Sequence, residues 1–311
     1  MRKRGYIIII AAAALALTSC DWASRMWQSV ANDGAEADST EATAYCTAEF
    51  TDSINVNNAV AYQEIRADFP SEADTSTLAQ IVLEWLCNEV RSRCWPDPEG
   101  TGFDSAFAVG EELDNFADNV VTTYGRKGLE QMEADLRDMA QEGYEGFFSN
   151  RLSIELLERS SERITFALEH DVYLGGAHGG QYLSGTTFSA ANGEPFTWKH
   201  FNMEKRAELI ELLKKGLMAY FNNGAEEPIT TETALLEQLI LYDNPDTPEN
   251  ELEYGLPLPV TAPWITRDGV CFVYQEYEIA AYACGRPFVV LPFEVVEPFL
   301  TEDGRKFISL K

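Results

Sequence analysis

Basic residues are scarce in this chain of 311 residues. Lysine and arginine together number 23, against 51 aspartates and glutamates, so the formal net charge at pH 7 is −28. Such an excess of negative charge disfavours nucleic acid and anionic lipid headgroups as partners and attracts cationic ones. A simpler interpretation stays open, in which the acidic surface only keeps the protein soluble.

Histidine is rarer still and occupies three positions, His170, His178 and His200. A metal site needs several converging ligands, and these histidines with Asp171 show neither helical ligand spacing nor an HExxH motif. The chain also contains no G-x-S-x-G nucleophile elbow. We therefore predict no metal, no cofactor and no catalytic residue. The alternative is a glycan-modifying enzyme of the envelope that uses His178 in acid/base chemistry.

Long apolar runs are missing apart from one near the start. Three basic residues at 2–4 precede the run YIIIIAAAALAL at 6–17, which is short for a membrane span but typical of a signal-peptide core. Residues 17–20, LTSC, resemble a bacterial lipobox, which implies cleavage before Cys20 and acylation of that cysteine. An ordinary secretory signal with a chance cysteine is the alternative. Two or three acyl chains would hold the protein firmly on a bilayer.

Cleavage would remove three positive charges and change the net charge from −28 to −31. Residues 20–44 are rich in Ala, Ser, Thr, Asp and Glu, a composition typical of a flexible tether. The predicted location is thus the bacterial cell envelope, with the lipid on Cys20 in a membrane and the domain on the periplasmic or cell-surface side.

Five cysteines remain besides Cys20, and none forms a CxxC motif. They are Cys46, Cys87, Cys94, Cys271 and Cys284. An odd number leaves at least one thiol without a partner in the same chain. Cys87 and Cys94 are seven residues apart on a helical pattern, so an unbroken helix would separate them by about 10 Å, too far for a disulfide. A bond between them requires the helix to end near Val90.

Hydrophobic periodicity predicts an α+β fold with helices packed on antiparallel sheets, in two interlocked subdomains at 45–150 and 151–311 after a signal peptide at 1–19. Strands are predicted at 46–56 and 61–70, as two strands with a turn near Ser160 in 151–176, and as a pair with a turn at Asn192-Gly193 in 181–198. Helices are predicted at 76–94, at 106–141 with an interruption near Gly125, at 204–221 and at 233–240. The last unit, 269–300, has the pattern of a long strand, a loop, a second strand and a short helix.

The stretch YLGGAHGGQYLSG at 173–185 sets two glycine pairs around His178. A phosphate-binding loop would open a helix, whereas this stretch lies between predicted strands. The glycines are expected to supply positive φ angles or close backbone approach at a bend. We expect His178 to hold that bend by hydrogen bonding.

Aromatic residues gather near the C-terminus, at Phe272, Tyr274, Tyr277, Tyr282, Phe288 and Phe293. Aromatics on strands are commonly core residues, and a contact surface for sugar or protein is the alternative. Tyr277 and Glu278 are expected on opposite faces of their strand.

Two of these segments resemble a known family. Residues 173–201 are similar to its pattern of a tyrosine, a Gly-Gly-Ala-His turn, a strand and a hairpin, and residues 269–300 to its closing strand ending in YEIApYaaG. It is the uncharacterised domain found in the ectodomain of a lysozyme-sensing anti-sigma factor and ahead of the catalytic domain of a peptidoglycan deacetylase. The resemblance spans about 151–300. Ala281 and Cys284 depart from the proline and the small residue usual there.

The resemblance implies a non-enzymatic envelope lipoprotein that binds lysozyme or a peptidoglycan fragment, and a purely structural lipoprotein is a further alternative. Lysozymes are usually cationic, so the acidic surface would accelerate their encounter in a salt-dependent way. Loops presented by a rigid sheet are where contacts usually lie. The predicted ligand-binding residues are Tyr173, Gly176, His178, Gly179, Tyr277, Glu278, Tyr282 and Arg286.

Overall fold

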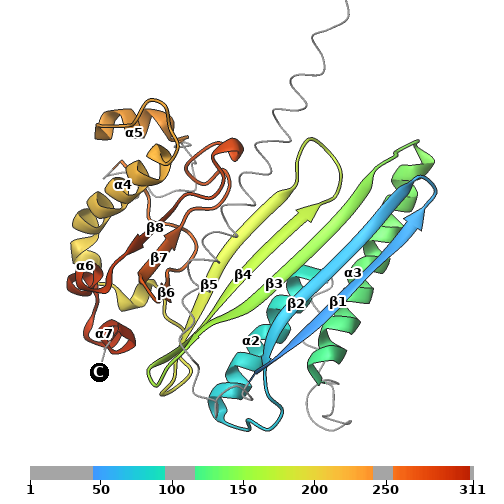
Figure 1. Ribbon diagram of the computed structural model, residues 1–311, viewed down its shortest axis with the longest axis horizontal. Coiled ribbons are helices and arrows are strands. Elements are labelled where there is room, and N and C mark those ends of the chain that lie inside the picture. The colour runs from blue at the N-terminus through green and yellow to red at the C-terminus, as the bar shows by residue number, and fades with distance from the viewer. Residues whose placement is uncertain (1–44, 95–115, 241–254, 309–311) are drawn as a thin grey trace, which may run out of the picture.

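The fold is α+β, as predicted, in a computed structural model that describes residues 45–94, 116–240 and 255–308. Two sheets organise it, a five-stranded sheet in the order β1-β2-β3-β4-β5 and a three-stranded sheet in the order β6-β7-β8 (Figure 1). The predicted signal peptide, Cys20 and the tether lie outside the described residues. Within the described ranges, no helix is both long and apolar enough to cross a membrane.

The large sheet is built from strands whose predicted alternation is confirmed. Its members are β1 (Tyr45–Val56), β2 (Ala59–Pro70), β3 (Phe147–Arg159), β4 (Arg163–Tyr173) and β5 (Gly180–Ser189). All neighbours are antiparallel except β2 and β3, which pair in parallel. A parallel pair needs a long crossover, and here the crossover contains α2 (Thr77–Cys94) and α3 (Phe116–Gln141).

Helices α2 and α3 cover one face of this sheet (Figure 1) and bury its apolar side chains, including Ile65, Phe166 and Leu168. The predicted interruption near Gly125 is wrong, because α3 runs through it. A Cβ on Gly125 would lie 2.2 Å from Cδ1 of Phe50 on β1. This glycine therefore permits close packing of helix on sheet and does not break the helix.

Helix α2 decides whether Cys87 and Cys94 can form a disulfide. Since α2 continues to Cys94, it does not end near Val90, and Cys87 and Cys94 cannot approach each other. Both thiols are buried, and Cys46, Cys271 and Cys284 are likewise free. Cys46 is exposed on β1, at the edge of the large sheet.

The C-terminal part stacks helices on the small sheet beyond β5 (Figure 1). Its elements are η2 (Trp198–His200), η3 (Met203–Lys205), α4 (Arg206–Asn222), α5 (Glu232–Gln238), β6 (Trp264–Thr266), β7 (Gly269–Val273), η5 (Tyr282–Cys284), β8 (Phe288–Leu291), α6 (Phe293–Val296), η6 (Glu297–Phe299) and α7 (Glu302–Ile308). Helix α4 buries Leu209, Ile210, Leu213 and Leu217 in the core, as its periodicity predicts.

Two strand predictions in this part are wrong. The segment after Asn192-Gly193 forms only a single bridge, Phe188 with Pro195, before the 3-10 turn η2. The long strand predicted at the start of the unit 269–300 begins as β7 but ends at Val273, whereas the second strand and the short helix of that unit are present as β8 and α6. The expected subdomain boundary between residues 150 and 151 falls inside β3, so the large sheet draws on both sides of that position.

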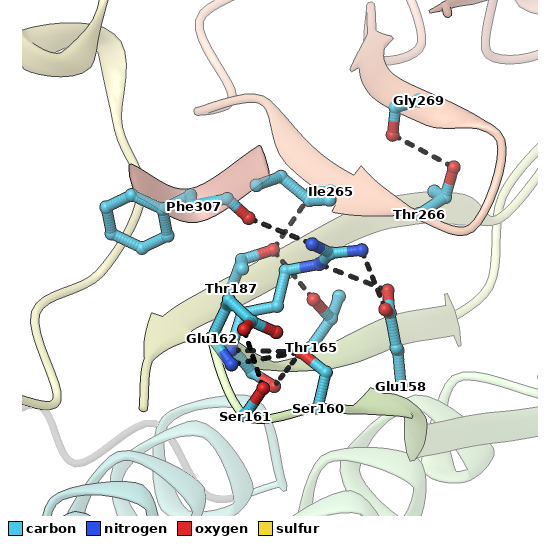
Figure 2. A network of polar contacts seen from close by, with 11 residues as sticks. Glu158, Ser160, Ser161, Glu162, Thr165, Thr187, Ile265, Thr266, Gly269 and Phe307 are labelled. Atoms are coloured by element: carbon cyan, nitrogen blue, oxygen red, sulfur yellow. Dashed lines mark hydrogen bonds and ion pairs between the residues drawn. The ribbon is translucent and has the colours of Figure 1, made fainter. Parts of the chain in front are cut away.

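A polar network joins the two sheets near the C-terminal end of β5 (Figure 2). Thr187 Oγ1 lies 2.9 Å from Thr165 Oγ1 and accepts a 2.9 Å hydrogen bond from the backbone N–H of Ile265 on β6. Beside it, the guanidinium of Arg163 pairs with Glu158 and donates to the carbonyl of Phe307 on α7. These contacts fix the C-terminal part on the sheet.

Candidate functional site

The glycine-rich loop between β4 and β5 is a turn, as predicted. Gly175 and Gly176 have φ angles of 86° and 95°, a region that favours glycine. A Cβ on Gly179 would lie 2.6 Å from the carbonyl oxygen of Val172, so close backbone approach explains that position. Tyr173 closes the turn by donating a 3.0 Å hydrogen bond to the carbonyl of Gly176.

His178 holds this turn and connects it to a second loop. Its Nδ1 lies 2.8 Å from the carbonyl oxygen of Gly179, so Nδ1 carries the proton and donates. In that tautomer Nε2 is an acceptor, and the Tyr277 hydroxyl lies 3.1 Å from it. The imidazole also stacks on Tyr282, with ring centroids 4.1 Å apart. We call His178, Tyr277 and Tyr282 the aromatic platform.

Tyr277 and Glu278 belong to a turn, so the prediction that they lie on opposite faces of a strand is wrong. The last rung between β7 and β8 is the 2.8 Å bond from the Tyr274 N–H to the Pro287 carbonyl. Beyond it, Glu278 N–H donates to the Gln275 carbonyl and Tyr277 takes a φ of 63°. Strained backbone of this kind in a non-glycine residue is concentrated at functional sites.

The turn leaves Tyr277 exposed and Glu278 partly covered. The Tyr277 side chain is 44% exposed. Glu278 accepts 2.7 Å hydrogen bonds from the backbone N–H groups of Gln275 and Val260, and burial raises the pKa of its carboxyl. Glu278 is thus a residue that supports the turn, while Tyr277 is presented outward.

Side chains from this turn complete the outer edge of β5. The Gln275 amide accepts from the Leu183 N–H at 3.2 Å and donates to the Leu183 carbonyl at 2.7 Å, as a neighbouring strand would. Glu276 accepts a 3.0 Å hydrogen bond from the Gln181 N–H. The two sheets are therefore joined through these side chains at the site, and the aromatic platform lies over that junction.

This junction gives a first testable prediction. Gln275→Ala leaves the backbone N–H and carbonyl of Leu183 without these partners, and we expect it to lower the free energy of unfolding by about 1–3 kcal/mol. Urea denaturation followed by circular dichroism measures the change. Gln181→Ala, which keeps its own backbone bond to Glu276, is the matched control. An equal loss in both variants would contradict the role of Gln275.

Arg286 follows Tyr282 in the same loop and is 8% exposed. One guanidinium nitrogen, Nη2, donates to Glu169 on β4 at 2.9 Å. Its Nη1 and Oδ1 of Asp171 are buried and have no hydrogen-bond partner among the described residues. Burial, followed by the nearby Glu169 carboxylate, raises the pKa of Asp171, while Arg286 opposes that shift.

The electrostatic balance around the platform is acidic. Burial raises the pKa of Glu276, although its hydrogen bond from Gln181 and the nearby Arg286 and His178 act in the opposite direction. Glu169, Asp171 and Glu276 lie close to the guanidinium of Arg286, and Arg151 is also near Asp171. The site therefore suits a cationic partner better than an anionic one.

The other two histidines have structural contacts elsewhere. His170 Nε2 lies 2.9 Å from Asn150 Oδ1, and Nδ2 of the same asparagine donates to the carbonyl of Arg93 at the end of α2. Burial lowers the pKa of His170 to about 4. His200 is buried in η2, where its Nδ1 accepts from the Thr197 N–H. Among the residues that the structure describes, no three potential ligands gather in a group that could hold a metal ion.

The structure brings Tyr173, Gly176, His178 and Gly179 together with Tyr277, Glu278, Tyr282 and Arg286 at one end of the β5 junction. Sequence reasoning missed Glu169, Gln275 and Glu276. No local pattern marks them, because their roles depend on contacts between segments about 90 residues or more apart, such as Gln275 with Leu183.

Comparisons with known proteins agree with this architecture. Residues 211–294 match the model of a family described as protein of unknown function (DUF3298). The match includes the Tyr277–Arg286 loop but not the His178 loop. No curated protein matches. A crystal structure of a DUF3298 family member from Bacteroides fragilis superposes with a TM-score of 0.62 at 17% identity, covering 84% of this chain and 95% of that one. A DUF3298 family protein from Pseudomonas aeruginosa gives 0.51 at 11% identity, covering 83% and 95%. At these identities the likeness is one of fold.

Proposed function

We propose that this chain, whose residues 211–294 match the DUF3298 family model, is an envelope lipoprotein that binds a protein ligand at the aromatic platform. The anchor is the predicted lipid on Cys20. The ligand that the resemblance to the anti-sigma factor ectodomain favours is lysozyme. The role is recognition, without catalysis.

One observation carries the proposal, namely that two loops 99 residues apart in sequence meet through the contact between Tyr277 and His178. Both side chains are exposed, and they stand on backbone held by positive φ angles and by hydrogen bonds to a rigid sheet. Tyrosine supplies a large contact area with few rotatable bonds, which makes it a common hot-spot residue in protein interfaces.

The geometry of His178 favours binding over catalysis. Both ring nitrogens are engaged, Nδ1 with the Gly179 carbonyl and Nε2 with the Tyr277 hydroxyl. A general base must offer a free nitrogen to its substrate. The competing hypothesis of a glycan-modifying enzyme is tested by assaying peptidoglycan turnover, and turnover that is abolished by His178→Ala would favour it.

The electrostatics favour a basic ligand. The net charge of −28 steers cationic proteins toward the chain at long range, and the carboxylates around Arg286 continue that sign at the site. Steering changes association rates and is screened by salt, so affinity at physiological salt must come from contacts at the platform.

The test removes those contacts. We expect Tyr277→Ala combined with Tyr282→Ala to weaken lysozyme binding at physiological salt by 30-fold or more, since a hot-spot residue contributes about 2 kcal/mol or more. Isothermal titration calorimetry gives the affinity. Tyr45→Ala, a tyrosine replaced at the start of β1 where it packs against Phe166, is the control. Unchanged affinity in the platform variant would remove the site assignment, and binding of peptidoglycan fragments in place of lysozyme would change the ligand.

A further inference from the structure

We infer that the docking surface for this ligand extends beyond the platform onto two exposed apolar flanks, and that it fits a folded basic protein with an apolar patch of its own. The first flank is Phe147, Tyr173 and Leu174, which we call the β3 flank. The second is Val260. The inference rests on the proposed function and specifies the size and the partner chemistry of the same site.

Large apolar side chains are exposed at few described positions, and most of these positions surround the platform. They are Phe147 (54% exposed), Leu174 (52%), Met203 (43%), Val260 (84%) and Tyr277 (44%). Of these, only Met203, in η3, has no contact or sequence link to the site in the described structure. Soluble proteins rarely gather exposed apolar side chains without a partner for them.

The β3 flank is fixed to the glycine-rich turn. The rings of Phe147 and Tyr173 pack with their centroids 4.9 Å apart, and the Tyr173 hydroxyl bonds to the Gly176 carbonyl. Leu174 directly follows Tyr173 and belongs to the same turn as His178. The flank and the platform therefore share one short segment of backbone.

Val260 is fixed to the other side of the platform. Its backbone N–H donates 2.7 Å to Oε1 of Glu278, while Oε2 of the same carboxylate accepts from the Gln275 N–H. One carboxylate thus holds the Val260 segment against the turn that presents Tyr277. The exposure of Val260 is not a consequence of a loosely placed loop, because its backbone is tied to the site.

The charges between the apolar positions define the partner. The segments 142–147, 174–179, 259–261 and 275–278 contain Glu142, Glu145, Glu276 and Glu278 and no lysine or arginine. Of the basic side chains close to these segments, Arg286 is buried and Arg151, on β3, pairs with Glu64. An apolar surface with a mainly acidic rim complements a protein whose own apolar patch has a basic rim. A second copy of this chain would bring the same negative rim into contact, so self-association is disfavoured.

The experiment compares flank variants of the full-length chain in detergent, with lysozyme as the probe. At physiological salt we expect Phe147→Ser combined with Leu174→Ser to weaken binding at least tenfold, and Val260→Ser to weaken it severalfold. Met203→Ser replaces another exposed apolar residue, 43% exposed and away from the site, and should leave affinity unchanged. The replaced side chains are exposed, and thermal melting checks that each variant is folded.

The outcomes distinguish failure of the extended surface from failure of the proposed function. If the wild-type chain binds and the flank variants bind equally well, the extended surface is wrong while the platform assignment stands. If the wild-type chain does not bind lysozyme, both are overturned. If light scattering shows a wild-type dimer that Phe147→Ser with Leu174→Ser converts to a monomer, the flank is a self-association surface and the inference is also overturned.

Discussion

Replacing Glu158 with alanine will destabilise the folded chain by about 3–5 kcal/mol, the range expected when one partner of a buried ion pair is removed. Arg163 and Glu158 have side-chain exposures of only 5% and 17%. Their contact is bidentate, with Nη2 and Nε of the guanidinium 2.7 Å and 3.2 Å from the two carboxylate oxygens. Without Glu158, the charge of Arg163 stays buried and keeps only uncharged partners, such as the Phe307 carbonyl and the Phe293 ring.

The ion pair lies where the C-terminal part of the chain contacts the large sheet (Figure 2), so its loss should weaken that contact first. Arg163 begins β4, and its Nη1 donates to the backbone carbonyl of Phe307 on α7 at 2.9 Å. Next to it, Thr187 connects β5 to Ile265 on β6. Loss of the ion pair should therefore release α7 before the strands of the large sheet.

Urea unfolding measures the free energy, and hydrogen exchange locates the first segment to open. Glu133→Ala removes the partner of the exposed Arg137, a surface pair that we expect to contribute under about 0.5 kcal/mol. Replacing both buried partners, with Glu158→Leu and Arg163→Met, should cost less than Glu158→Ala alone. A single variant as stable as the wild-type chain would show that Arg163 finds water or another partner.

Gly185→Ala will have the second largest effect on stability, about 1–3 kcal/mol or more, through overpacking against Trp264. An added Cβ would lie 2.3 Å from Cγ of that indole, and Trp264 is only 1% exposed. The contact lies where β5 of the large sheet meets β6 of the small one. Neither the indole nor the strand can shift without disturbing Leu183, Cys271 and Val273, which pack in the same cluster.

Thermal unfolding with tryptophan fluorescence measures this change. Gly180→Ala is the matched control on the same strand, because its Cβ would meet only Cγ1 of Val172, at 3.7 Å, an ordinary van der Waals contact. We expect that control to lie within about 0.5 kcal/mol of the wild-type chain. Equal melting temperatures for the two variants would mean that the sheets are not packed as closely as described.

The elements predicted most accurately from sequence are those in which one buried face gives the hydrophobic residues a regular spacing. The alternation in β1 and β2 and the 3.6-residue pattern of α4 identify one buried face each, whatever lies on the other side. The prediction that the helix breaks near Gly125 was wrong because the glycine is required by the ring of Phe50, which leaves no room for a side chain at this position. A single sequence does not reveal which strand a helix approaches closely.

The site was predicted in part for a related reason. The glycines of the 173–185 stretch indicate a backbone conformation that depends only on neighbouring residues, so the turn and the role of His178 in it could be predicted. The end of β7 at Val273 was missed because Tyr277 and Glu278 alternate as a strand would. The strand ends because of a tertiary contact, in which the side chains of Gln275 and Glu276 bind the backbone of β5 in the other sheet.

Binding of lysozyme by the aromatic platform is tested by the affinity of the full-length chain for lysozyme at low and at physiological salt, with lysozyme activity followed in the same samples. The account predicts binding that weakens but persists at physiological salt, inhibits the enzyme, and is lost with Tyr277→Ala and Tyr282→Ala. Binding that disappears with added salt, or that survives loss of both tyrosines, would contradict it.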